Sequence, residues 1–156
     1  MIFIDPGVHM CGASSFTASG MLVYAGWYTV EETIRMVATA KICKVFIEIP
    51  RIYGTAQQKG NQNDLIDLAF SAGRVIGQSK NFEILYPREW KGTMKKEAMT
   101  ERIIEVARAR GEFSVPTLPS AKGKQHNVWD AVGIGYEHFG YINQKKIFRG
   151  GESAKR

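Results

Sequence analysis

Three acidic residues lie inside or directly beside apolar stretches, where an ionised carboxylate is costly. Asp5 follows "MIFI", Glu48 interrupts "KVFIEIP", and Asp130 lies within "NVWDAVGIG". A buried carboxylate needs a cation or hydrogen-bond donors to offset its desolvation. If the first two stretches are neighbouring strands, their acids converge at one end of a sheet, and Asp130 can complete the cluster. Hard oxygen ligands of this kind suit Mg²⁺ or Mn²⁺ rather than zinc.

Two further polar residues precede the last acid. His126 and Asn127 lie four and three residues before Asp130. On a helix all three share one face and can point at one site, while the apolar residues between them pack on the sheet. Gly133 and Gly135 would then allow the helix to approach the sheet closely.

Each of these residues also has a purely structural interpretation. Asp5 could cap the "DPG" turn, and Glu48 could face solvent at a sheet edge. His126 could be a surface histidine at the start of a helix. These alternatives stay open at the level of single residues.

Missing motifs exclude several common chemistries. The sequence contains no GxxxxGK[ST] phosphate loop, no GxSxG elbow and no HExxH zinc helix, so a nucleotide cofactor, acyl transfer and zinc proteolysis are not indicated. Phosphodiester cleavage fits clustered acids. In that chemistry two metal ions about 3.5 to 4 Å apart activate water and stabilise the leaving oxygen.

The charge of the chain favours a polyanionic partner. It has 21 Lys and Arg against 15 Asp and Glu, a formal charge of +6 and a pI near 9.4. Residues 87–124 hold nine of these cations against five Glu. A basic stretch of this kind is typical of nucleic-acid binding, although many proteins with a basic pI bind no polyanion.

Length and composition indicate one globular domain. The chain has 156 residues, of which 44% are hydrophobic, enough for one core. We expect the domain to span residues 1–142 and residues 143–156 to form a basic, poorly ordered tail. Cys11 and Cys43 lack metal-site spacing and predict free, buried thiols. Without a signal peptide or a long apolar run, we expect a cytoplasmic protein with no membrane association.

Periodicity predicts the elements that would position these residues. Strands are expected at 1–4, 11–18, 21–26, 44–50 and 82–87, the second and third forming a hairpin. Helices are expected at 30–41, from Asn63 to Ile76, from a cap at Thr93 to about Arg110, and around Asp130, with a loop over 111–124. This order predicts an α/β fold, a mixed sheet flanked by helices.

Four stretches in this order resemble the RuvC-like Holliday junction resolvases of the RNase H superfamily, particularly the short phage-encoded type. "IDPGVHMCG" is similar to the first-strand motif, with a glycine seven residues beyond the acid. "VFIEIP" stands at the place of the second acid, "NDLIDLAFSAGRVIG" resembles the central helix, and "NVWDAVGIG" the closing acidic helix. The resemblance covers residues 1 to about 140.

The resemblance implies an RNase H-like five-stranded sheet, with three antiparallel strands followed by parallel ones. It also implies a homodimer with two active sites that nicks paired strands of a four-way DNA junction. Asp5, Glu48 and Asp130 would be metal ligands for two Mg²⁺ per site, with Mn²⁺ as a substitute. The central helix would supply the dimer contact through residues such as Leu68, Phe70 and Ile76, unless these belong to the monomer core.

The resemblance extends to the basic segment. "YPREWKGTMKKE" is similar to a family stretch that supports catalysis and phosphate binding, which assigns these roles to Lys91, Lys95 and Lys96. Tyr53 lies in a loop where the family inserts an aromatic side chain; it would stack on a base for about 1–3 kcal/mol, or pack on the domain. The expected nucleic-acid contacts are Arg51, Tyr53, Arg88, Lys91, Lys95, Lys96, Lys122 and Lys124.

One position departs from the family pattern. Many relatives carry an acid three residues before the last Asp, where this chain has Asn127, preceded by His126. Either residue could bind the second metal, which leaves the preference between magnesium and manganese open. Two other functions fit the same sequence: an RNase H-like nuclease that cuts flaps, forks or RNA/DNA hybrids, and a non-catalytic DNA-binding module. An actin-like ATPase would need two lobes, for which the chain is too short.

Overall fold

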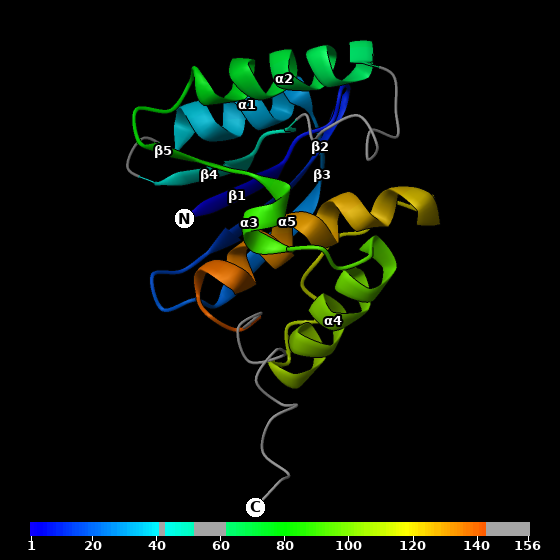
Figure 1. The fold of residues 1–156 in the computed structure, drawn as a ribbon. Helices are drawn as coiled ribbons and strands as arrows, with labels where there is room; N and C mark the ends of the chain where they lie inside the picture. Colours follow the sequence, from blue (N-terminus) through cyan, green and yellow to red (C-terminus); the bar gives the residue numbers. More distant parts are fainter. Residues whose placement is uncertain (41–42, 52–61, 143–156) are drawn as a thin grey trace, which may run out of the picture.

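The computed structural model describes residues 1–40, 43–51 and 62–142, drawn in colour in Figure 1. The tail over 143–156 and the loop residue Tyr53, both singled out from the sequence, lie outside these ranges. The strands are β1 (Ile2–Asp5), β2 (Met10–Phe16), β3 (Leu22–Thr29), β4 (Val45–Glu48) and β5 (Phe82–Leu85). The helices are α1 (Val30–Thr39), α2 (Gln62–Ile76), α3 (Pro87–Trp90), α4 (Lys96–Ala109), the 3-10 turn η2 (Lys122–Lys124) and α5 (Gln125–His138).

The five strands form one mixed sheet in the order β3-β2-β1-β4-β5. Strands β1, β2 and β3 are antiparallel neighbours, whereas β4 is parallel to β1 and β5 is parallel to β4. A short hairpin suffices for the antiparallel pair, while the parallel strands require the crossover helices α1 and α2. The predicted sheet of three antiparallel strands followed by parallel ones is confirmed.

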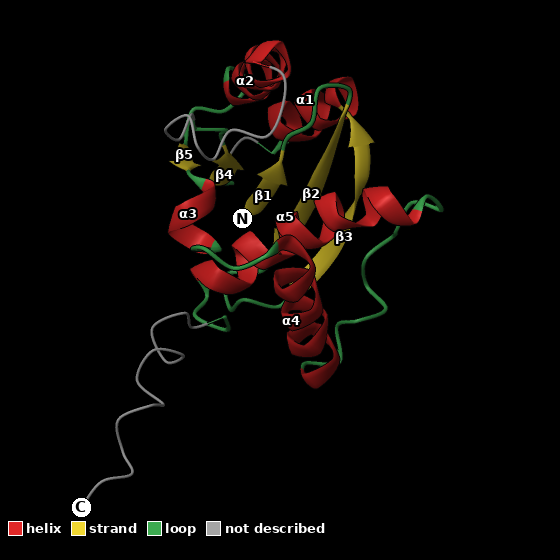
Figure 2. Ribbon diagram, turned by 45° about the vertical axis from the view of Figure 1, so that its right-hand side comes forward, coloured by secondary structure: helices red, strands yellow, loops and turns green. Residues whose placement is uncertain are grey.

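Alternation along the strands divides the core into two layers. Ile2 and Ile4 of β1 pack with α1 and α2 on one face of the sheet. Phe3 of β1 and Phe46 of β4 face the other side, where they pack with α5. Figures 1 and 2 show α1 and α2 on one side of the sheet and α5 on the other, with α4 outside α5. Because side chains alternate along a strand, Asp5 and Glu48 continue the face that carries Phe3 and Phe46.

The segment between β5 and α4 differs from the predicted one. Thr93 does not begin the long helix: α4 starts after Lys95, and a separate short helix, α3, precedes it. Pro87 stands at the start of α3, and the Glu89 carboxylate accepts a 2.8 Å hydrogen bond from the Tyr86 N–H. Gly92 has a φ of 59°, which ends α3 with a turn that other residues rarely adopt. The chain therefore bends between the two helices instead of entering α4 directly.

The two helix glycines have different partners. A Cβ at Gly135 would collide with the Phe16 ring of β2, so this glycine does allow α5 to approach the sheet. A Cβ at Gly133 would instead meet Ile103 of α4 and, at 2.9 Å, the Trp90 ring. The prediction that both glycines face the sheet is wrong for Gly133, because α5 is covered on that side by α3 and α4.

Both cysteines carry free thiols, as predicted. Cys11 is buried, whereas Cys43 is half-buried at the entry to β4. Among the described residues, none of the helices has the length and apolar character needed to cross a membrane.

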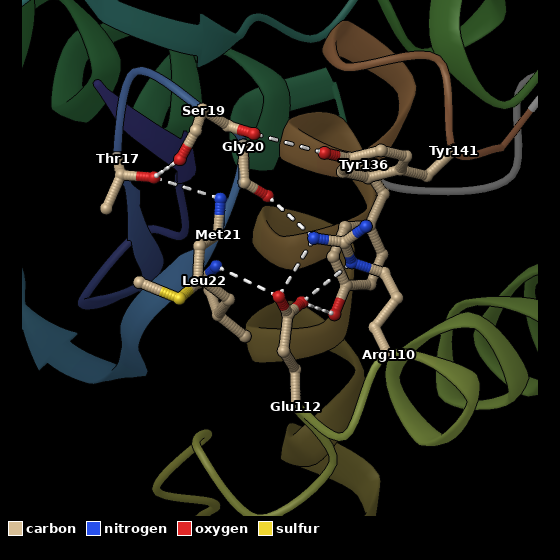
Figure 3. A network of polar contacts seen from close by, with 9 residues as sticks. All are labelled: Thr17, Ser19, Gly20, Met21, Leu22, Arg110, Glu112, Tyr136 and Tyr141. Atoms are coloured by element: carbon tan, nitrogen blue, oxygen red, sulfur yellow. Dashed lines mark hydrogen bonds and ion pairs between the residues drawn. The ribbon is translucent and has the colours of Figure 1, made fainter.

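A buried carboxylate ties the end of the sheet opposite Asp5 to α5 (Figure 3). Glu112 accepts hydrogen bonds from Arg110 (3.0 and 3.1 Å), the Tyr136 hydroxyl (2.8 Å) and the Leu22 N–H (3.4 Å). Arg110 also donates to the Gly20 carbonyl at 3.0 Å. Burial alone would raise the pKa of Glu112, but the hydrogen bonds from Arg110 and Tyr136 outweigh it and lower the pKa. The carboxylate is therefore ionised and links the β2–β3 turn, the end of α4 and α5.

Glu112→Gln is expected to lower the free energy of unfolding by about 2 kcal/mol at neutral pH, because it removes charge-assisted hydrogen bonds from buried donors. Since the folded state lowers the pKa of Glu112, this stabilisation is present above the unfolded pKa and is lost as the pH falls through the folded one. Urea unfolding at pH 7.5 and at acidic pH measures the difference. Glu101→Gln, at an exposed position on α4, is the matched control; an equal effect of both changes would refute the assignment.

Candidate active site

The acids of β1 and β4 meet at the carboxyl ends of two adjacent parallel strands. Ile4 pairs with Ile47, so Asp5 and Glu48 are the next residues of the two strands and face the same side. Both acids are only 9% exposed. Strand β4 lies between β1 and β5, so the alternative that Glu48 faces solvent from a sheet edge is wrong.

Helix α5 brings the third acid to this point because it lies very close to β2. Gly12, the register partner of Asp5, faces the backbone of Asn127, and a Cβ there would overlap the Asn127 carbonyl. Two residues along β2, the Ser14 hydroxyl donates a 2.8 Å hydrogen bond to the Ala131 carbonyl. Asp130, 5% exposed, is thereby held over the end of β1.

Consecutive residues at the end of α3 contact the acids. The Lys91 ammonium lies 3.5 Å from Glu48 Oε2 and 3.5 Å from Asp130 Oδ2. The indole N–H of Trp90 donates a hydrogen bond to the same Glu48 Oε2. Trp90 is 2% exposed and belongs to the core beneath α5. One carboxylate oxygen thus receives both a neutral and a charged donor.

The charges in this cluster influence one another strongly. Burial, followed by repulsion from Glu48 and Asp130, raises the pKa of Asp5 well above its ordinary value. Burial also raises the pKa of Glu48, although Lys91 and Trp90 oppose the shift. Burial would lower the pKa of Lys91, but the attraction of the three carboxylates raises it. The site therefore concentrates negative charge around one ammonium.

A pocket of about 240 Å³ opens beside the cluster. It is lined by Asp5, Pro6, Lys91, Met94, Lys96, His126, Asn127 and Asp130. Glu48 does not line the pocket, but it contacts Lys91, which does. The structure thus brings His126 and Asn127 together with two of the three acids, as their spacing predicted.

The imidazole of His126 is suited to act as a ligand. Burial and the nearby Lys96 lower its pKa, against the attraction of Asp130. A neutral imidazole at pH 7 has a nitrogen lone pair for a metal or a proton. Neither His126 nor Asn127 carries the negative charge of the acid found in the family pattern.

The predicted basic contacts are unevenly placed. Lys91 and Lys96 line the pocket, whereas Lys95 is exposed outside its lining, at the cap of α4. Lys122 and Lys124 are exposed on η2, directly before the helix that carries His126. The exposed Arg88 belongs to α3, and the exposed Arg51 places its guanidinium 5.0 Å from the centre of the Tyr86 ring.

The donor set fits a hard divalent cation in type and charge, because three carboxylates gather with an amide and a neutral imidazole. As the side chains stand, however, no group of three or more His, Cys, Asp or Glu residues within 1–40, 43–51 and 62–142 is arranged to hold a metal ion. The Lys91 ammonium instead lies 3.5 Å from an oxygen of both Glu48 and Asp130. The residues suit magnesium, but they are arranged around a lysine.

Sequence reasoning missed three residues of the site. Trp90 contacts Glu48, and Pro6 and Met94 line the pocket. Trp90 stands in "PREWKG", where a large apolar residue interrupts a polar, basic segment. This contrast is the feature of the sequence that could have indicated a buried role for Trp90. Pro6 and Met94 gave none, because their positions depend on how β1 and α4 meet.

Comparisons with known proteins identify the fold. No protein-family model matches the sequence, and no curated protein matches it. Among solved structures, "T. thermophilus RuvC in complex with Holliday junction substrate" aligns over 90% of this chain and 94% of its own, with a TM-score of 0.59 and 14% identity. A further Thermus thermophilus RuvC structure aligns over 90% of this chain and 95% of its own, with 17% identity and a TM-score of 0.49. The first likeness shows that the chain has a RuvC-like fold of the RNase H type.

Proposed function

We propose that this protein is a metal-dependent endonuclease that acts on branched DNA and resolves four-way junctions by hydrolysing phosphodiester bonds. The observation that carries the proposal is the convergence of three buried acids from separate elements: Asp5 and Asp130 line one pocket, and Glu48 contacts Lys91, which lines the same pocket. The RuvC-like fold supports the same reading, because one neighbour of that fold is described in complex with a Holliday junction substrate. We regard the chain as a short, phage-type member of that group.

The acids would hold two Mg²⁺ ions, with Mn²⁺ as a substitute, and His126 or Asn127 would complete the second site. Bound metal supplies an activated water and stabilisation of the leaving oxygen. The chain's own residues do the rest. Lys91 and Lys96 line the pocket and would bind the phosphate next to the bond that is cut, with Lys95 contacting the backbone further out.

Further basic residues would position the DNA. Lys122 and Lys124 stand on η2 directly before α5, Arg88 belongs to α3, and Arg51 lies beside the Tyr86 ring. Tyr53 follows Arg51 in the sequence and would reach an unpaired base. Basic side chains of this kind contact DNA phosphates, so the affinity for DNA should fall steeply as the salt concentration rises. We place this activity in the cytoplasm of a bacterial or phage-infected cell.

A homodimer would allow paired cuts. Helix α2 exposes Phe70 to 69% and Ile66 to 66%, so Phe70 is not part of the monomer core, whereas Leu68 and Ile76 are half-buried. Large exposed apolar side chains on one helix mark an association surface. A two-fold axis through α2 would present two active sites to the two strands of a junction.

Two observations favour a second candidate, a DNA-binding module without catalysis. The described side chains form no ready group of three metal ligands, and Asn127 stands where many relatives have an acid. Such a module would bind branched DNA and cut nothing. A nuclease for flaps, forks or RNA/DNA hybrids uses the same acids and differs only in the DNA-binding surface.

A substrate panel separates these functions. Purified protein is incubated with a labelled four-way junction, a flap, a replication fork, an RNA/DNA hybrid and a linear duplex, in Mg²⁺, in Mn²⁺ and with chelator. We expect symmetric nicks in the junction, none in the duplex and none with chelator. If the protein cuts the flap, fork or hybrid in preference to the junction, it is the related nuclease and not a junction resolvase. If it binds DNA but cuts nothing in either metal, it is the non-catalytic module.

A further inference from the structure

Lys91 places a cation between two of the three carboxylates. Its ammonium is 3.5 Å from Glu48 Oε2 on β4 and 3.5 Å from Asp130 Oδ2 on α5. The lysine side chain is 24% exposed, whereas the two carboxylate side chains are 12% and 6% exposed. An ammonium in contact with two carboxylates occupies the kind of position that a divalent cation takes between such ligands.

Trp90 contacts the same Glu48 carboxylate as Lys91. Its indole donates to Glu48 Oε2 from within the core, and its ring packs against the place of Gly133 on α5. Trp90 has no freedom to leave without opening the core. Lys91, by contrast, is half-buried, lines the pocket and has a long flexible stem. The two neighbours thus form a fixed contact and a movable one.

We propose that Lys91 is a positioning residue that holds Glu48 and Asp130 together in the metal-free protein and is displaced into the pocket by the divalent cation. Trp90 keeps Glu48 in place during this exchange. The inference rests on the proposed metal-dependent function, which it deepens by naming the group that competes with the metal. A cation and the ammonium repel each other and need the same oxygens, so the two cannot share the position.

The displacement would link metal binding to substrate binding. Lys91 already lines the pocket that Lys96 and His126 border, so an ammonium expelled from the carboxylates remains where a phosphate would lie. The metal-free protein avoids a cluster of uncompensated carboxylates, and the metal-bound protein gains a free cation for the DNA. Lys91 therefore opposes metal binding and favours substrate binding.

Mn²⁺ titration of the full-length, metal-free protein tests this competition without relying on activity. Isothermal calorimetry and the electron spin resonance signal of free Mn²⁺ give the dissociation constant. Lys91→Met keeps the stem and removes the charge, and we expect Mn²⁺ to bind about tenfold more tightly because two ion pairs no longer have to be broken. Trp90→Phe keeps an aromatic ring at this position, although a smaller one, and removes the N–H, and we expect about tenfold weaker binding.

Lys80→Met is the matched control, since Lys80 is exposed between α2 and β5 and lies outside the lining of this pocket. For this control we expect the Mn²⁺ dissociation constant to change by less than about twofold, because the lysine has no ion pair with the carboxylates that the metal must break. Thermal unfolding in chelator establishes that each variant is folded. A general loss of structure cannot tighten binding, so the opposite signs for Lys91→Met and Trp90→Phe are specific to the exchange.

The outcomes separate the inference from the proposed function. Unchanged or weaker Mn²⁺ binding by Lys91→Met overturns the exchange, even if the wild-type protein cleaves junctions. Tighter binding by Lys91→Met supports the exchange, even if the wild-type protein cuts a flap or hybrid instead of a junction. Absence of Mn²⁺ binding in every variant overturns both.

Discussion

Asp5→Asn is expected to reduce cleavage of a four-way junction by at least about a hundredfold, because it removes one of three carboxylates that would hold the metal ions, a contribution of several kcal/mol to the transition state. The change is nearly isosteric, and Asp5 ends a strand whose hydrogen bonds do not depend on its charge. Junction binding should persist, since it depends on lysines and arginines. Gel-based cleavage and binding assays in Mg²⁺ give both values.

The same variant should be at least as stable as the wild type when no metal is present. Asp5, Glu48 and Asp130 repel one another, which is one reason why the pKa of Asp5 is raised after burial itself. Removing one charge relieves this repulsion, as is typical of active sites that sacrifice stability for function. Urea unfolding in chelator measures the change, with Asp67→Asn at an exposed position of α2 as control. Retained cleavage, or a loss of both cleavage and folding, would contradict the assigned role of Asp5.

The meeting of Asp5 and Glu48 could be predicted from the sequence because side chains along a strand repeat every two residues, which is a short period. Side chains alternate along a strand, so an acid at the end of a buried run has only two possible faces. The parallel pairing of β1 with β4 then places Asp5 and Glu48 together. For α5, the three- and four-residue spacing of a helix was sufficient to group Asn127 and His126 with Asp130.

The segment between β5 and α4 could not be predicted in the same way. Helix α3 spans only Pro87–Trp90, too short for a periodic pattern, and its end depends on one left-handed glycine, Gly92. An error in where α4 begins changes which lysine faces the site. Lys96 lines the pocket, whereas Lys95 stands at the N-cap position of α4 outside the lining. In the sequence the two are adjacent lysines that cannot be told apart.

The contact between Trp90 and Glu48 shows that part of the site depends on tertiary contacts, which local sequence patterns do not reveal. The two residues are 42 positions apart, and nothing in the spacing of either stretch links them. Their contact follows from the turn that α3 makes after β5, which aims the indole at the neighbouring strand. A carboxylate that is isolated in the sequence therefore has a buried donor and a cation as partners in the fold.

Gly12→Ala is expected to disturb both stability and catalysis, because α5 lies against the backbone of β2 at this residue. An added Cβ would overlap the Asn127 carbonyl and reach the Val128 nitrogen at 3.0 Å. These are backbone atoms, so α5 itself must shift, at a cost of about 1–3 kcal/mol in the free energy of unfolding. Alanine fits the extended backbone of a strand, so no loss is expected from conformation alone.

The shift would also move Asp130 and Asn127 away from Asp5, the register partner of Gly12. A displacement on the order of 1 Å at a reacting centre lowers the rate by about a hundredfold, so cleavage should fall even in the fraction that remains folded. Gly73→Ala is the control, because a Cβ there meets nothing within 4 Å and should stabilise α2 by roughly 0.5–1 kcal/mol. Urea unfolding and junction cleavage measured on the same preparations would show the two losses together in Gly12→Ala. A variant that unfolds earlier but cleaves at the wild-type rate when folded would mean that the close approach of α5 serves stability alone and that Asp130 is positioned by other contacts.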